Sequence, residues 1–204
     1  MRPSGVRAVA GTLLAAALLA ITLVDGPASA GDLTNAARPV TTPASLLTRL
    51  EPLWRAVASG DLALASPLFF PRAPYVTMKT GEIPAPASDY AHRLWALYQL
   101  DLATYHRALA TGPAPRLVGV RAVASDVTWI PPGDCENRFG YWHLGEVRLE
   151  FRRQRALWSV GVFSLISWAG HWYVVHLGPN PRPAPVGTLD HLVRGPGVAG
   201  AGGC

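Results

Sequence analysis

The sequence predicts a single α+β domain in which N-terminal helices pack on a curved antiparallel sheet. Between residues 43 and 109, apolar residues recur at helical spacing, as expected for helices with one buried face. After Gly112 the period changes to two, which is typical of strands. Helices followed by an antiparallel meander favour an α+β architecture. An open two-layer sandwich of the same elements is the alternative.

The first 30 residues have the pattern of a secretory signal peptide. Arg2 and Arg7 precede an uncharged apolar stretch, and Ala28-Ser29-Ala30 supplies the small residues that a signal peptidase requires. The apolar stretch is shorter than the ~20 residues that span a bilayer, although a retained membrane anchor is the alternative. We therefore expect a mature protein that is secreted or associated with the cell envelope.

The mature chain divides by composition into three parts. Residues 31–43 are small and polar and are expected to form a flexible lead, and residues 44–178 hold the single domain. Residues 179–204 form a tail rich in Pro and Gly, in which only residues 189–193 indicate local structure.

Helix and strand boundaries are marked by Pro, Gly and capping residues. Thr42-Pro43 begins a helix that Gly60 ends, and Pro52 is expected to kink or divide it. A short helix follows Asp61, and a second long helix begins at Ser88-Asp89. Strands are expected at residues 75–80, 117–122, 126–130, 146–152, 157–168 and 171–177, with a hairpin turn at Ala169-Gly170.

Two stretches resemble the NTF2-like superfamily, which includes the SnoaL-type and ketosteroid-isomerase-type proteins. Residues 54–61 and 68–71 are similar to the opening helix of the family, its Gly-Asp break and its short second helix. Residues 167–177 are similar to its closing hairpin, and the whole chain also resembles exported actinobacterial proteins. The resemblance spans roughly residues 44–178. It implies a cone-shaped α+β fold with a pocket between helices and sheet, which in this family serves enzymes, binding modules and assembly domains alike.

Two residues are candidate acid–base groups. His176 lies on the last predicted strand, which would line the pocket of a cone fold; a histidine that is hydrogen-bonded in the core or exposed on the sheet is the alternative. Asp101 lies in phase with the apolar stripe of the second long helix, where a carboxylate is costly unless it is paired. It is either a buried ion pair or an acid–base group facing the pocket.

Aromatic residues and histidines near the strand ends are candidate pocket residues. We expect Trp129, Tyr141 and His143 to line the pocket together with His176, although most aromatic residues of the chain belong to the core. Outward aromatic side chains would suit a partner surface or a homodimer contact.

The two cysteines and the basic charge carry little functional information. For an exported chain, a disulfide between Cys135 and Cys204 is one arrangement, and an intermolecular bridge or two free thiols are the others. The formal net charge is +5, but no basic helix or basic-aromatic platform is present, so nucleic-acid binding is not expected. Of 18 basic residues only Lys79 is a lysine, a bias typical of a GC-rich genome.

The sequence contains no Ser-centred nucleophile motif, phosphate loop, dinucleotide fingerprint or metal-binding helix. Neither a cofactor nor a metal is therefore expected. The leading hypothesis is a non-catalytic exported domain that binds a small apolar ligand or a cell-envelope component. The alternatives are an NTF2-like lyase or isomerase that acts on a hydrophobic substrate through Asp101 and His176, and a structural protein that self-associates.

The signal peptide yields the first prediction. Cleavage after Ala30 should give a mature protein that begins at Gly31, because residues 28–30 fit the peptidase site. N-terminal sequencing of protein from the culture medium measures this directly. Intact residues 1–30 embedded in the membrane would contradict export with cleavage.

Overall fold

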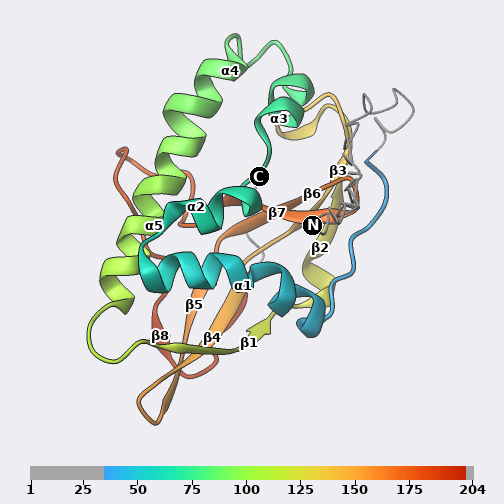
Figure 1. Ribbon diagram of the computed structural model, residues 1–204. Coiled ribbons are helices and arrows are strands. Elements are labelled where there is room, and N and C mark those ends of the chain that lie inside the picture. Colours follow the sequence, from blue (N-terminus) through green and yellow to red (C-terminus); the bar gives the residue numbers. More distant parts are fainter. Residues whose placement is uncertain (1–34, 201–204) are drawn as a thin grey trace, which may run out of the picture.

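A computed structural model describes residues 35–200 of the chain as helices packed on antiparallel sheets (Figure 1). The α+β prediction is therefore confirmed. The predicted signal peptide and Cys204 lie outside the described residues. None of the helices within residues 35–200 is both long and apolar enough to cross a membrane.

The helices occupy the first half of the described chain. Thr42 caps the first one through a hydrogen bond from the Ser45 backbone N–H to its side chain, and Gly60 ends it with a φ of 76°. Pro52 does not divide this helix, which runs unbroken through it. The helical elements are α1 (Pro43–Ser59), α2 (Leu62–Ala65), the 3-10 turns η2 (Ser66–Leu68), η4 (Ala124–Asp126) and η5 (Asp134–Glu136), α3 (Arg72–Met78), α4 (Pro86–Asp89), the π-helical turn η3 (Tyr90–Trp95) and α5 (Ala96–Leu109).

The strands form two four-stranded antiparallel sheets, with the orders β1-β4-β5-β8 and β2-β3-β6-β7. Their bounds are β1 (Arg116–Arg121), β2 (Val127–Ile130), β3 (Tyr141–Leu144), β4 (Val147–Arg153), β5 (Ala156–Val162), β6 (Ser164–Trp168), β7 (His171–His176) and β8 (Val193–Arg194).

The central strands connect the two sheets. Only two residues separate β3 from β4, and Phe163 alone separates β5 from β6. Val147 lies opposite Val162 in one sheet, and Leu144 lies opposite Leu165 in the other. One long antiparallel pair of chain segments therefore runs through both sheets, and the strand predicted at residues 157–168 is interrupted at the point where it passes between them.

The core lies between the helices and both sheets. The ring of Trp54 on α1 packs 5.0 Å from that of Phe151 on β4. On α5, the hydroxyl of Tyr105 lies 2.8 Å from the carbonyl oxygen of Gly161 and 2.9 Å from that of Leu177. These contacts hold both long helices against the strands, as the apolar stripes of the sequence predict.

Two local predictions are wrong. Residues 75–80 are expected as a strand, but most of them belong to α3, where Pro71 is the N-cap and Pro74 falls in the first turn, where proline is tolerated. A short apolar run does not distinguish strand from helix. In addition, β3 is absent from the predicted strands, although it carries two of the predicted pocket residues.

The segments predicted as a flexible lead and as a tail pack on the domain instead. Asn35 is buried, and its side-chain amide donates a 2.8 Å hydrogen bond to the Ser167 carbonyl oxygen. At the other end of the chain, Val193 pairs with Ser159 through β8, and Asp190 is fully buried. The domain therefore extends beyond the predicted range of 44–178 in both directions.

The hairpin between β6 and β7 yields the second prediction. Ala169 and Gly170 have φ values of 48° and 75°, the left-handed pair of a tight two-residue turn. Gly170→Val should lower the free energy of unfolding by roughly 1–3 kcal/mol, because a β-branched residue is strained at this φ. Denaturant melts measure the loss.

Gly81→Val is the matched control for this substitution. Gly81 has open space around its Cα and no positive φ, so the same side chain should change stability by less than about 0.5 kcal/mol. Equal losses for the two variants would show that backbone strain at Gly170 is not the cause.

Candidate functional site

A cavity of about 350 Å³ lies between α3, η3 and one face of the β2-β3-β6-β7 sheet. Its volume falls at the lower end of the roughly 300–1,000 Å³ that is typical of small-molecule sites. The walls combine apolar side chains with titratable and hydrogen-bonding groups. The residues that line it are Tyr75, Met78, Lys79, Ile83, Arg93, Leu94, Cys135, Glu136, Asn137, Tyr141, His143, Ser164, Ile166, Val175, His176 and Asn180.

The sheet wall is set by strand alternation on β3 and β6. Tyr141 and His143 are two residues apart on β3, and Ser164 and Ile166 are two residues apart on β6, so each pair shares one face of its strand. Three of the four predicted pocket residues, Tyr141, His143 and His176, line the cavity.

A β-bulge on β7 directs two consecutive residues to the cavity. Ser164 pairs with His176, but the next residue, Leu165, pairs with Val174, which leaves Val175 as the extra residue. Both Val175 and His176 line the cavity, although simple alternation would place them on opposite faces. Bulges are frequent next to functional sites, where they redirect a side chain.

The two cavity histidines are neutral at physiological pH. Burial lowers the pKa of His176 to about 3, and the positive charges of Arg93, Arg182 and Lys79 add to the effect. Burial also lowers the pKa of His143, whose Nε2 lies 2.9 Å from the hydroxyl oxygen of Ser164. Each imidazole therefore offers one donor and one acceptor but no charge.

The helix wall carries a hydrogen-bonded group of three side chains. Arg93 on η3 binds Asp89 through two contacts, Nε to Oδ1 at 2.6 Å and Nη2 to Oδ2 at 2.7 Å. The hydroxyl of Tyr75 donates to the same carboxylate and accepts a 3.1 Å hydrogen bond from Arg93. The guanidinium at this wall is therefore already neutralised by its own carboxylate partner.

Lys79 is a cavity residue that the sequence patterns did not single out as a site. Its side chain is 10% exposed, and its Nζ lies 3.7 Å from a carboxylate oxygen of Glu136 and 5.1 Å from the ring centroid of Tyr75. Burial lowers the pKa of Lys79, against the opposing charge of Glu136. The composition held the one available signal, because Lys79 is the only lysine of the chain.

Asp101 does not belong to the residues that line the cavity. Its carboxylate accepts hydrogen bonds from both Nη atoms of Arg182, at 2.6 and 2.9 Å. It also accepts hydrogen bonds from the backbone N–H groups of Gly178, at 2.9 Å, and Thr188, at 2.8 Å. The Asp101 side chain is 1% exposed, and both of its carboxylate oxygens are hydrogen-bonded. Of the two alternatives that the sequence left open, the structure shows the buried ion pair, which ties the C-terminal segment to α5.

Trp129 also lies away from the cavity lining. It stands on β2, is 36% exposed, and packs against the ring of Trp142 at 5.3 Å. Its indole covers Gly140, where an added Cβ would lie 2.2 Å from the ring. The aromatic ring that the sequence assigned to the pocket thus covers the outer part of the sheet.

Cys135 lies at the rim of the cavity and is not a free thiol. Of the arrangements that the sequence left open, a disulfide to Cys204 stays a hypothesis, because Cys204 lies outside the described residues.

Within residues 35–200, one group of side chains has the spacing of a cation site. Ligand atoms of Glu146, Asp190 and His191 lie within 4.8 Å of one another, away from the cavity lining. Arg148 already supplies a positive charge there, with its Nη1 2.6 Å from Glu146 Oε1. Burial, followed by the charge of Glu146, raises the pKa of Asp190. We interpret this group as a charge network, buried at Glu146 and Asp190 and exposed at His191, that joins the C-terminal segment to β4.

The third prediction concerns His176 and pH. Between pH about 6.5 and about 3 the unfolded chain binds a proton at this histidine that the folded chain rejects. Stability should therefore fall as pH falls through this window, and His176→Gln should remove that part of the loss. Urea melts measure the free energy of unfolding at pH 7 and at pH 4.5. The loss between these two pH values should be smaller by about 2 kcal/mol in His176→Gln than in the unsubstituted protein.

His171→Gln is the control for the pH experiment. His171 is an exposed residue on the same strand, so its replacement should leave the difference between pH 7 and pH 4.5 unchanged. A His176→Gln variant with the same pH dependence as the unsubstituted protein would show that this imidazole is not kept neutral by burial.

Comparison with known proteins gives no family for this chain. It matches no protein-family model, no curated protein and no solved structure. The resemblance to the NTF2-like superfamily therefore stays a prediction.

Proposed function

We propose that the protein is an exported, NTF2-like domain that binds a small molecule in the cavity between α3, η3 and the β2-β3-β6-β7 sheet. The observation that carries the proposal is the cavity itself, with its volume of about 350 Å³ and its mixed lining. One polar atom in its wall supports a ligand in particular. The side-chain oxygen of Asn137 is buried and has no hydrogen-bond partner among the described residues, and a buried acceptor of this kind is costly unless something donates to it.

The cone-shaped fold of the proposal is supported by the connections between the two sheets. The central strands β3–β4 and β5–β6 continue from one sheet into the other, and both long helices lie against them. A sheet that bends in this way encloses a space on its inner side, which is the place where the family resemblance implies a pocket.

The chemistry of the lining favours a neutral polar ligand over a purely apolar one. Lys79 is close to Glu136, Arg93 is bound to Asp89, and His176 is neutral, so the charges of the cavity are nearly balanced. A charged ligand would lose its hydration without gaining an unpaired opposite charge. We therefore propose a ligand with an apolar body and one uncharged hydrogen-bonding group.

The neutral histidines favour a second candidate function, acid–base catalysis on the bound molecule. An imidazole that is uncharged at physiological pH can accept a proton, and His143 is already hydrogen-bonded to Ser164. In this alternative His143 is the acid–base group, because a pKa of about 3 makes His176 a weak base, and Asp101 has only a structural role because its carboxylate is occupied by Arg182.

The fourth prediction tests binding through the cavity. Native mass spectrometry of the protein isolated from its producing cell should show a retained small molecule, and Val175→Trp should abolish it, because the indole would fill the space that Val175 lines. Val123→Trp is the matched control, since Val123 is 40% exposed and the same ring is added at the surface.

The outcome also depends on folding, which thermal melts of both variants check. A ligand that is retained equally by Val175→Trp and Val123→Trp would place binding elsewhere. If the unsubstituted protein carries no ligand and no compound of a neutral small-molecule library raises its Tm, the proposal fails.

A further inference from the structure

Lys79 is the only lysine in a chain with 18 basic residues. Seventeen positions that carry a positive side chain use arginine, so a position that required only a charge would be expected to carry arginine too. Lysine differs from arginine in one chemical respect that matters in a cavity, because its amine loses its proton at accessible pH and becomes a nucleophile, whereas a guanidinium does not. The single exception to the arginine rule lies in the cavity wall.

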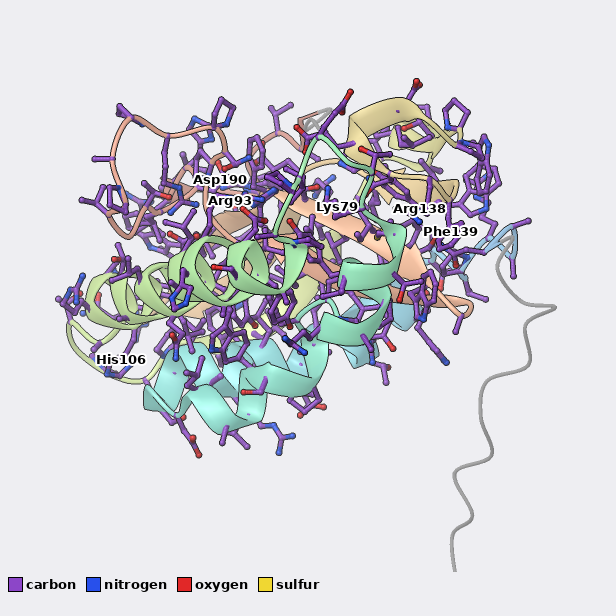
Figure 2. All side chains as sticks on the ribbon, turned by 90° about the horizontal axis from the view of Figure 1, so that it is seen from above. Lys79, Arg93, His106, Arg138, Phe139 and Asp190 are labelled. Atoms are coloured by element: carbon purple, nitrogen blue, oxygen red, sulfur yellow. The ribbon has the colours of Figure 1, made fainter. Side chains whose placement is uncertain are left out.

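The fold holds Lys79 between two segments that are distant in sequence. Lys79 directly follows α3 and forms an isolated antiparallel bridge with Asn137. On either side, the Arg138 N–H donates to the Met78 carbonyl oxygen at 2.7 Å, and the Thr80 N–H donates to the Glu136 carbonyl oxygen at 2.9 Å. The lysine backbone is therefore fixed at both neighbours, and its side chain lines the cavity. Figure 2 labels Lys79 and Arg138.

The loop that faces Lys79 is held in an unusual backbone conformation. Cys135 and Glu136 have φ values of 52° and 61°, the left-handed region that residues with a side chain rarely adopt. This conformation brings the Cys135 carbonyl oxygen to 3.4 Å and the Glu136 carboxylate to 3.7 Å from Nζ. Backbone strain of this kind gathers at functional sites, and here it places an acceptor and a proton carrier beside one amine.

The surroundings of the amine favour its neutral form. The side chain is 10% exposed, and burial lowers the pKa of Lys79. The charged groups that face it are Glu136 and Asp89, which oppose this shift, and Arg93, which adds to it. The Tyr75 ring lies 5.1 Å from Nζ and closes the site on the helix side.

We propose that Lys79 binds an aldehyde or ketone in the cavity covalently, as a Schiff base on its ε-nitrogen. The proposal rests on the proposed function, since it names the reactive group of the ligand that the cavity holds. A carbonyl compound is uncharged, as the nearly balanced charges of the cavity require, and its carbon is the electrophile that a neutral amine attacks.

The reaction balances with groups that are present in the cavity. The free amine attacks the carbonyl carbon and forms a C–N bond, the carbonyl oxygen takes up a proton, and a carbinolamine results. Loss of this hydroxyl as water, with the second nitrogen proton, leaves the C=N bond, so that amine plus carbonyl gives imine plus one water. Glu136, at 3.7 Å, can take the proton that the ammonium releases, give it to the leaving hydroxyl, and then accept the second nitrogen proton from the iminium. The unpartnered oxygen of Asn137 can accept a hydrogen bond from the carbinolamine.

The experiment uses the fact that the chain has one ε-amine. The mature protein is incubated with benzaldehyde and sodium cyanoborohydride at pH 7, and intact mass together with peptide mapping follows the benzyl adduct at Lys79 separately from the N-terminal amine. We expect one saturable adduct at Lys79, slowed by the non-carbonyl analogue benzyl alcohol. Its rate against pH should rise at lower pH than the rate for the same lysine in the urea-unfolded chain.

A variant with the same composition is the matched control. Lys79→Arg combined with Arg155→Lys keeps the net charge and the single lysine but moves the lysine to an exposed position at the turn between β4 and β5. Lys79 should be trapped about tenfold faster than this surface lysine, because the cavity holds the aldehyde next to an amine whose pKa is lowered by burial. Equal rates, or a rate at Lys79 that matches the unfolded chain, would overturn the proposal.

Failure of covalent capture is distinguishable from failure of the cavity. Benzyl alcohol that raises the Tm of the unsubstituted protein and of Val123→Trp, but not of Val175→Trp, shows that the cavity binds small molecules. If Lys79 is not trapped in the same protein, the proposed Schiff base is wrong. If benzyl alcohol raises none of the three and trapping is also absent, both the proposed function and the covalent step fail.

Discussion

The antiparallel pairing of β3–β4 with β5–β6 is the constraint on which the rest of the structure depends. The register is the same on both sides of the break between the sheets, with Val147 opposite Val162 and Leu144 opposite Leu165, so this pair of segments links the two sheets. A shift by one residue would exchange the inward and outward faces of every strand involved. His143 and Ser164, which this pairing brings to neighbouring strands, would then no longer meet at 2.9 Å across the cavity wall.

The C-terminal segment is held on the domain by polar contacts to α5. Asp101 on α5 binds Arg182, and the Tyr105 hydroxyl accepts a hydrogen bond from the Asp190 backbone, so two buried polar groups of one helix fix a segment that has little apolar character of its own. A buried carboxylate is costly when it is unpaired. The cost explains why Asp101 accepts hydrogen bonds from five donor atoms, and why its place on the apolar stripe indicates a structural role rather than a catalytic one.

Local sequence signals predicted the parts of the fold that local physics determines. The Thr42 cap, the Gly60 end and the Ala169-Gly170 turn all depend on the φ and side chain of one or two residues, and each lies where it is expected. Tertiary contacts determine the rest. The extra residue at Val175 is visible only against its partner strand, so alternation alone cannot place Val175 and His176 at the same cavity. Lys79 was missed as a site residue because its position depends on a bridge to a loop 58 residues away.

Charge pairing within the cavity limits the chemistry that the site can perform. Arg93 is bound by Asp89 and Lys79 faces Glu136, so neither cation is free to hold an anion, and burial keeps the histidines neutral. The two ion pairs differ in one respect. The Arg93 pair is short, bidentate and permanently charged, whereas the Lys79 pair is a longer contact to an amine whose pKa is lowered by burial. The Arg93–Asp89 pair stays charged and holds its two side chains in place. The Lys79–Glu136 pair becomes uncharged when the proton moves from the amine to the carboxylate. The reactivity proposed for Lys79 therefore depends on the contact between its amine and the Glu136 carboxylate, and the loop with positive φ values that carries Glu136 sets that distance.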